Sequence, residues 1–93
     1  LCTGNSARSI LAEHLLRARG GDRFDVYSAG SHPTGPVHPL ALDILVQHQI
    51  DVSQARSKSW ELYRDVCFDF VITVCDRAKE SCPIWPGQPL AAH

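Results

Sequence analysis

The strongest constraint on the fold is the segment at residues 68–74, which reads FDFVITV. Aromatic and β-branched residues favour a strand, and the near-absence of polar residues indicates a strand that is covered on both faces. Strands of that kind belong to parallel sheets, and parallel strands are joined by long crossover connections that are usually helical. The segment therefore predicts an α/β architecture.

The rest of the chain supplies the other elements of such a fold. Three segments are predicted to be helices: residues 9–19, 39–49 and 59–63. Each has apolar residues at helical spacing and a capping residue, Pro or Gly at one end. A second strand signal lies at residues 24–28. Residues 76–82 are consistent with either a helix or an irregular segment, and residues 83–93, rich in Pro and Gly, are expected to be a loop.

The first predicted helix begins close to Leu1, although a doubly wound fold normally places a strand before its first helix. The chain also contains no methionine. We therefore expect residues 1–93 to form a single partial domain whose first central strand is cut off.

Composition excludes several classes of protein. Nine basic and ten acidic residues give a net charge of -1, whereas a nucleic-acid-binding domain carries a basic stripe. No apolar run reaches the roughly 18 residues of a membrane span, and no signal peptide is evident. These features predict a cytoplasmic protein. Its four cysteines are then expected to be catalytic, redox-active or buried thiols rather than structural disulfides.

Residues 2–9, with the sequence CTGNSARS, combine the chemistry of an anion-binding loop with that of a nucleophile. Gly4 and Asn5 tolerate the left-handed backbone of a tight loop, whose amides, at a helix N-terminus, attract an oxyanion. Arg8 can bind two oxygens of the same anion, and Ser9 can donate a hydrogen bond to a Cys2 thiolate. The residues predicted to bind the oxyanion are Thr3, Gly4, Asn5, Ser6, Ala7 and Arg8.

Several motifs in combination carry a family resemblance. CTGNSARS, the pair Ala12-Glu13 in the next helix, the sequence YSAG, a Pro- and Gly-containing loop and the sequence VITVCD resemble the low-molecular-weight protein tyrosine phosphatase superfamily. Within it the chain is most similar to the thioredoxin-coupled arsenate reductases. The resemblance implies a flavodoxin-like three-layer fold, a monomer, Cys2 as the nucleophile that attacks arsenate, and phosphate or sulfate as analogues.

Two further thiols distinguish a reductase from a phosphatase. Cys75 follows the strongest strand and Cys82 lies seven residues later. In a relay, Cys75 would attack the Cys2 sulfur and expel arsenite, and Cys82 would then exchange onto Cys75. Seven helical residues span about 10.5 Å, whereas a disulfide needs Cα atoms within about 7 Å. The segment between these two cysteines is therefore expected to rearrange on oxidation.

Other functions remain open from the sequence. One is a phosphatase that acts on phosphate monoesters; another is a non-catalytic thiol module that binds arsenite or senses redox state. Glutaredoxin or another thiol could replace thioredoxin as the reductant. A zinc site is not supported, because the paired Cys and His spacings of such sites are missing. Cys67 is expected to be a small buried residue.

The resemblance also implies a cation site. Asn5, Glu13 and Ser28 are similar to positions that bind potassium in some of these reductases, but an acidic ligand of that pattern is replaced by the region of Lys58, whose ammonium could take the place of the cation. Trp60 and Trp85 are expected to be packing residues. The histidines are expected on the surface or in loops: His14, His32, His38, His48 and His93.

The superfamily uses an aspartate of an Asp-Pro pair as its general acid, and none of the seven aspartates here precedes a proline. The resemblance places that acid shortly after residue 93. We therefore expect the 93 residues to keep the motifs of the enzyme without being active by themselves.

Overall fold

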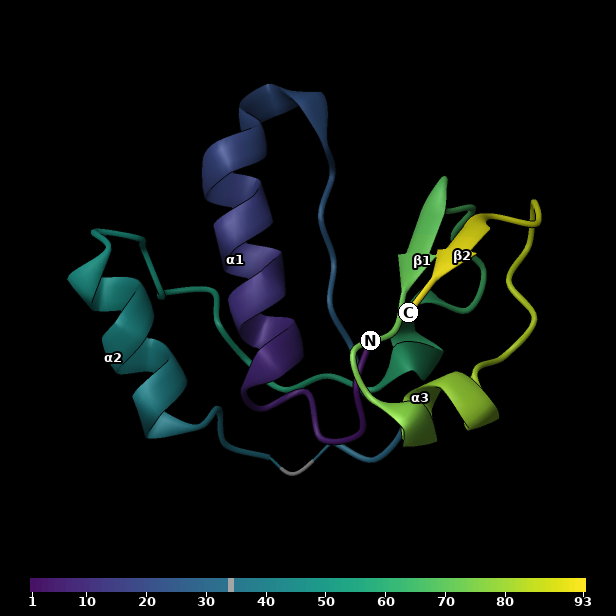
Figure 1. Ribbon diagram of the computed structural model, residues 1–93, viewed down its shortest axis with the longest axis horizontal. Coiled ribbons are helices and arrows are strands. Elements are labelled where there is room, and N and C mark those ends of the chain that lie inside the picture. Colours follow the sequence, from purple (N-terminus) through teal and green to yellow (C-terminus); the bar gives the residue numbers. More distant parts are fainter. Residues whose placement is uncertain (34) are drawn as a thin grey trace.

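The computed structural model describes residues 1–33 and 35–93 (Figure 1). Among these residues, no helix combines the length and the apolar content that crossing a membrane would require. Three α-helices and two strands carry labels in Figure 1, and two short 3-10 helices accompany them. In chain order the elements are α1 (Arg8–Gly20), a 3-10 helix (Gly21–Arg23), α2 (Pro39–Gln47), a 3-10 helix (Trp60–Tyr63), β1 (Phe70–Ile72), α3 (Asp76–Ser81) and β2 (Leu90–Ala92).

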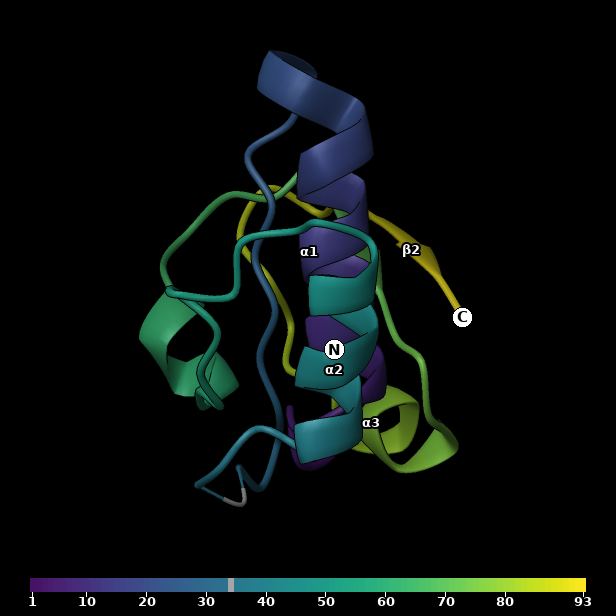
Figure 2. The same cartoon turned by 90° about the vertical axis from the view of Figure 1, so that its left-hand side faces the viewer.

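Helices α1 and α2 lie side by side at one end of the molecule, as Figures 1 and 2 both show. Their packing buries Ile10 of α1 together with Ala41 and Leu45 of α2. Pro39 occupies the first turn of α2, and the His38 side chain caps that helix by accepting a hydrogen bond from the Leu40 amide at 3.1 Å. The helix predictions at residues 9–19 and 39–49 are confirmed, although α2 ends two residues earlier.

Strands β1 and β2 pair in parallel, with Val71 opposite Ala91, and α3 lies in the crossover between them. The parallel sheet and its helical crossover are therefore confirmed. The prediction of a loop throughout residues 83–93 was wrong at its end. Residues 90–92 form β2, because a run of small and apolar residues after Pro89 can extend along β1.

The prediction that residues 68–74 are covered on both faces was also wrong. Val71 is buried, but Phe70 is 59% exposed and Ile72 is 50% exposed. The second predicted strand, residues 24–28, has no ladder partner among the described residues; only Gly30 forms isolated bridges, to Cys2 and Ser59. Between this segment, α1 and β1 lies a groove of about 430 Å³, lined by residues such as Leu16, Val26 and Phe70. Both predictions assumed neighbouring segments that the described residues do not provide: no strand pairs with residues 24–28, and no layer covers Phe70 and Ile72.

A hydrophobic core joins β1 and α3 to the second 3-10 helix and to the extended segment at Ala29. Its buried members are Ala29, Trp60, Val71, Ala78 and Trp85. The ring of Trp85 meets Phe68 edge-on, with the centroids 5.4 Å apart, a geometry that aromatic pairs favour. Both tryptophans are thus packing residues, as predicted. Cys75 and Cys82, the residues that flank α3, are partly buried against this core.

Candidate active site

The anion loop, residues 2–9, runs from the N-terminal extended residues into the first turn of α1. Cys2 is 5% exposed and Asn5 is fully buried. Asn5 has a φ angle of 49°, the left-handed conformation that was predicted at this part of the loop. The loop therefore turns sharply and presents its backbone at the N-terminus of α1, whose dipole favours a negative charge there.

The carbonyl groups of the anion loop are bound by three other segments of the chain. Backbone amides of residues 31, 32 and 38 donate to the carbonyls of Cys2, Thr3 and Ser6, at 3.2, 2.8 and 2.8 Å. The Ser57 hydroxyl donates to the Asn5 carbonyl at 2.6 Å. Among the described residues, the amides of residues 4, 6 and 7 have no acceptor, whereas the Thr3 amide donates to the Cys75 sulfur. Because other segments of the chain bind its carbonyls, the loop can offer its unbonded amides to an oxyanion.

The Cys2 sulfur accepts hydrogen bonds from within the loop. The Asn5 amide donates to it at 3.1 Å, and the Ser9 hydroxyl lies 2.8 Å away. The Asn5 side chain in turn donates to the Ser9 oxygen at 2.7 Å, which leaves the Ser9 proton for Cys2. Arg8 is exposed and donates to the carbonyl of Val74 at 3.0 Å. The predicted nucleophile, its hydrogen-bond donor and the predicted anion-binding arginine thus share one loop.

Gly30 is a structural requirement of the loop that was not predicted as a site residue. A Cβ atom at this position would lie 2.4 Å from the Thr3 carbonyl and 2.9 Å from the Asn5 amide nitrogen. Gly30 also donates its amide to the Lys58 carbonyl and accepts from the Trp60 amide, at 2.8 and 3.0 Å. The available signal was the glycine that ends the YSAG sequence. It marks the place where the anion loop and the extended segment touch through their backbones.

The second predicted thiol lies beside the anion loop. The Cys75 sulfur is 3.2 Å from the Thr3 hydroxyl, although the two residues are far apart in the sequence. Burial opposes ionisation of Cys75, but hydrogen bonds from Thr3 and from the Ala78 backbone, with the nearby charge of Arg8, outweigh it and lower the pKa of the thiol. The structure thus brings Cys75 to the loop, where its pKa lies below the ordinary value of a thiol.

The third predicted thiol, Cys82, lies at the opposite end of α3 from Cys75. The indole nitrogen of Trp85 donates a hydrogen bond to the Cys82 sulfur at 3.3 Å, a contact that the sequence analysis did not predict. All four cysteines are free thiols. Cys67 is exposed on the connection before β1, so its predicted burial was wrong.

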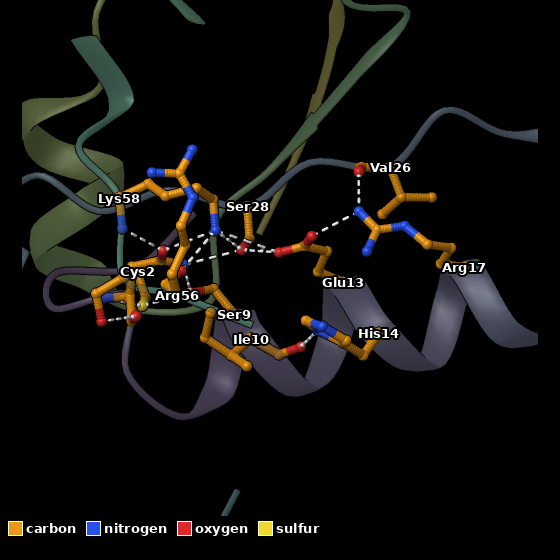
Figure 3. Close-up of polar contacts among 12 residues, drawn as sticks. Cys2, Ser9, Ile10, Glu13, His14, Arg17, Val26, Ser28, Arg56 and Lys58 are labelled. Atoms are coloured by element: carbon orange, nitrogen blue, oxygen red, sulfur yellow. Dashed lines mark hydrogen bonds and ion pairs between the residues drawn. The ribbon is translucent and has the colours of Figure 1, made fainter. Parts of the chain in front are cut away.

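Behind the anion loop lies a buried polar cluster, defined here as Asn5, Glu13, Ser28 and Lys58 (Figure 3). The Lys58 ammonium is 3.3 Å from the Asn5 side-chain oxygen, 3.3 Å from the Ser28 hydroxyl and 3.5 Å from Glu13 Oε1. It donates to the Arg56 carbonyl at 2.7 Å, and the Ser28 hydroxyl donates to Glu13. The residues of the predicted potassium site are therefore together, but the lysine nitrogen lies among their oxygens, and a potassium ion does not fit beside it.

Opposing effects set the charges of this cluster. Burial raises the pKa of Glu13, but the Ser28 hydrogen bond and the charges of Lys58 and Arg17 outweigh it, so the pKa of Glu13 lies below its ordinary value. Burial lowers the pKa of Lys58, and Glu13 only partly compensates. The cluster thus stabilises the carboxylate, whereas the ammonium is opposed by burial and supported by Glu13.

The histidines contribute to the anion loop through the backbone amides of His32 and His38, not through their side chains. His14 is buried in α1, where its Nδ1 lies 3.0 Å from the Ile10 carbonyl, so the prediction that every histidine is a surface or loop residue was wrong. Its position on the face of α1 that packs inward explains the burial. Within the described ranges, His, Cys, Asp and Glu side chains form no cluster of three that could hold a metal ion.

An α/β fold with a parallel crossover, a cysteine in an anion loop at a helix N-terminus and an arginine at the end of that loop together define the class of cysteine-dependent, oxyanion-binding proteins. Over residues 1–90 the chain matches the low molecular weight phosphotyrosine protein phosphatase family. The chain belongs to this family.

Curated relatives and solved structures agree with this assignment. The chain is 38% identical over 93 residues to an arsenate reductase of Halalkalibacterium halodurans and to one of Staphylococcus xylosus, covering all of this chain and 66% and 70% of theirs. It thus spans about two thirds of the length of these relatives. A solved arsenate reductase in the phosphate binding state is 30% identical, with a TM-score of 0.83 over 98% of this chain and 69% of that one. A thioredoxin-dependent arsenate reductase of Corynebacterium glutamicum is 35% identical, with a TM-score of 0.80 over 99% and 45%. The flavodoxin-like fold is confirmed by these structures.

Proposed function

We propose that the protein reduces arsenate to arsenite for arsenic detoxification, with Cys2 as the nucleophile and Cys75 and Cys82 as an intramolecular thiol relay. The observation that carries the proposal is the 3.2 Å contact between the Cys75 sulfur and the Thr3 hydroxyl of the anion loop. Hydrolysis of a phosphate ester has no use for a second thiol at that place. A reductase needs one, because two electrons must reach the arsenic from sulfur.

Binding of the oxyanion is assigned to the loop residues Thr3 to Arg8. Their backbone amides and the Arg8 guanidinium are complementary to a tetrahedral anion such as arsenate, and phosphate or sulfate would bind as analogues. In the present geometry the Arg8 side chain is held by the Val74 carbonyl at 3.0 Å, so it would exchange this bond for the anion. In its present position the charge of Arg8 also helps to lower the pKa of Cys75.

The reaction balances in three steps. The Cys2 thiolate displaces hydroxide, which leaves as water after protonation, and forms a sulfur–arsenic(V) bond. The Cys75 thiolate then attacks the Cys2 sulfur; the electron pair of the sulfur–arsenic bond stays on arsenic, which leaves as arsenite, and a Cys2–Cys75 disulfide forms. Finally, Cys82 attacks Cys75, which frees Cys2 and leaves a Cys75–Cys82 disulfide for an external dithiol.

Thioredoxin is the proposed external dithiol, and the thioredoxin dependence of the Corynebacterium glutamicum relative supports it. A relay that must return to its thiol form needs a reducing compartment, so we propose that the protein acts in the cytoplasm. We also propose that it acts as a monomer. No bound cofactor is required by these steps.

The test is a coupled assay on the complete gene product, in which arsenate, thioredoxin, thioredoxin reductase and NADPH are supplied and NADPH oxidation is followed. Cys75→Ser is expected to lower turnover by at least about a thousandfold, because the arsenic adduct then has no attacking thiol. Cys82→Ser should release one arsenite per protein and stop at the Cys2–Cys75 disulfide. Cys67→Ser is the matched control, since that thiol is exposed and outside the site, and it should keep full turnover.

Two other outcomes would overturn the proposal. Hydrolysis of a phosphate monoester that needs Cys2 but not Cys75, without arsenate turnover, would identify a phosphatase. Stoichiometric arsenite binding without any turnover would identify a thiol module that binds arsenite or senses redox state. Turnover of arsenate that survives Cys75→Ser would disprove the relay.

A further inference from the structure

The buried polar cluster behind the anion loop contains more hydrogen-bond acceptors than an uncharged amine could satisfy. Four oxygens surround the Lys58 nitrogen at 2.7 to 3.5 Å: the Arg56 carbonyl, the Asn5 amide oxygen, the Ser28 hydroxyl and a Glu13 carboxylate oxygen. A neutral amine has two donor hydrogens, whereas an ammonium has three and carries a positive charge. One of these oxygens belongs to the Glu13 carboxylate, whose other oxygen is paired with Arg17 at 2.5 Å. Because the Lys58 and Glu13 side chains are buried, the cage favours a charged ammonium over a neutral amine at its centre.

This cage is connected directly to the anion loop. The Lys58 backbone amide donates to the Asn5 side-chain oxygen at 2.8 Å, and the other end of that side chain donates to Ser9 and Ser28, at 2.7 and 3.0 Å. Asn5 is the fully buried residue in the left-handed conformation, and its amide donates to the Cys2 sulfur. The oxygen cage thus orients the Asn5 side chain, and Asn5 in turn determines the conformation of the anion loop.

We propose that Lys58 is a positioning residue whose ammonium is a built-in monovalent cation, which holds Asn5, and through it the anion loop, in the oxyanion-binding conformation without a dissolved cation. The inference rests on the proposed oxyanion binding by residues 3–8. It predicts that this protein, unlike one with an open oxygen cage, is insensitive to potassium. Because the ammonium is covalently attached, it cannot be diluted away or exchanged.

The experiment measures phosphate binding by the complete gene product in tetramethylammonium chloride, sodium chloride, potassium chloride and ammonium chloride at equal ionic strength. The unsubstituted protein should bind phosphate equally in all four salts. Lys58→Ala should bind it about tenfold more weakly in tetramethylammonium, which is about 1.4 kcal/mol. Potassium or ammonium should restore the affinity, because these ions fit among the oxygens that Lys58 has left, and tetramethylammonium is too large.

Lys58→Met is the matched variant, because its uncharged side chain fills most of the lysine volume and excludes an ion. It should bind phosphate weakly in every salt. A purely structural role of Lys58 would weaken both variants without any dependence on the cation, and that result would overturn the proposal. So would a phosphate affinity of the unsubstituted protein that rises with potassium, or a Lys58→Ala variant that equals it in tetramethylammonium.

The measurement separates this inference from the proposed function. If the unsubstituted protein binds no phosphate, the oxyanion role fails, and the thermal midpoint of Lys58→Ala in the same four salts still tests the cage. Recovery of that midpoint in potassium or ammonium alone supports the built-in cation. If Lys58→Ala does not fold in tetramethylammonium chloride, recovery of folding in potassium or ammonium chloride supports the proposal, and failure to fold in all four salts overturns it.

Discussion

The anion loop and the segment that carries the relay thiols are held in very different ways. The loop, residues 2–9, is fastened by hydrogen bonds from residues 31, 32, 38 and 57, and Cys2, Asn5 and Ser9 are buried. The relay segment, residues 75–85, contains the six-residue helix α3, and Ile84 within it is 96% exposed. It is held mainly by Ala78 and Trp85 in the core.

This difference corresponds to what the proposed chemistry asks of each region. An oxyanion is bound well only by donors that are already in place, so the loop must be rigid before the anion arrives. A thiol that has to reach a second sulfur must instead lie in a segment that opens at small cost. Under the proposed function, the nucleophile would be held in a rigid loop, whereas the relay segment would be the part that opens.

The largest effect is expected from Gly30→Ala, which disturbs the packing of the anion loop. The added Cβ would lie 2.4 Å from the Thr3 carbonyl and 2.9 Å from the Asn5 amide nitrogen. Neither atom can move away freely, because the carbonyl accepts from the His32 amide and the Asn5 amide donates to Cys2. We expect the free energy of unfolding to fall by about 3 kcal/mol or more, measured by urea denaturation.

Gly20→Ala is the matched control for that substitution. Its Cβ would approach only the Phe24 ring, at 2.7 Å, and Phe24 is about half exposed and can rotate away. The last residue of α1 also gains helix propensity from alanine, so stability should change by less than about 1 kcal/mol. Equal losses for the two variants would show that the loop is less rigid than its hydrogen bonds indicate.

Sequence patterns predicted the parts of the fold that depend on local signals. The helical period of α1, the proline at the start of α2 and the Ser59 cap of the 3-10 helix all act within a few residues, and the structure has each of them. The strand predicted at residues 24–28 and the two-sided burial of residues 68–74 failed, because both depend on neighbours in space. The described residues provide those neighbours only at Gly30 and on the Val71 side.

The candidate site divides in the same manner. The loop sequence is sufficient to place Cys2, Asn5, Arg8 and Ser9 together, because all four lie within eight consecutive residues. The contact of Thr3 with Cys75 and the donation from Trp85 to Cys82 join parts of the chain that only tertiary packing brings together. Gly30 was missed for the same reason, since its importance lies in two backbone atoms of another segment.

A smaller effect, on local stability, is expected in the relay segment when the protein is oxidised. Cys75 and Cys82 flank α3, and seven helical residues span about 10.5 Å, too far for a disulfide, which needs Cα atoms within about 7 Å. Formation of the Cys75–Cys82 bond must therefore unwind α3. Amide exchange of residues 76–81 should accelerate at least about tenfold on oxidation, which is about 1.4 kcal/mol of local stability, while residues 5–9 remain unchanged.

The control is the Cys82→Ser variant under the same oxidant. In this variant, amide exchange in α3 should stay at the rate seen in the reduced, unsubstituted protein. Unchanged protection of residues 75–85 in oxidised protein would contradict the rearrangement. Faster exchange in the anion loop as well would show that the two regions are not mechanically separate.

The smallest effect is expected where the two regions touch, at Thr3. Its hydroxyl helps to lower the pKa of Cys75 against the opposing effect of burial. Thr3→Val keeps the shape of the side chain and removes the hydrogen bond, so the pKa of Cys75 should rise and less thiolate should be present at pH 7. Alkylation of Cys75 at pH 7, followed by peptide mass spectrometry, should slow about three- to tenfold.

The pH dependence distinguishes this electrostatic role from a change in access. Because the pKa of the Cys75 thiol rises in Thr3→Val, its alkylation profile should move to higher pH, and the two proteins should react at equal rates once both thiols are ionised. Thr3→Ser retains the hydroxyl and should follow the profile of the unsubstituted protein. A slower rate for Thr3→Val that persists at high pH would instead mean that the contact controls access to Cys75, and the anion loop would then gate that thiol rather than activate it.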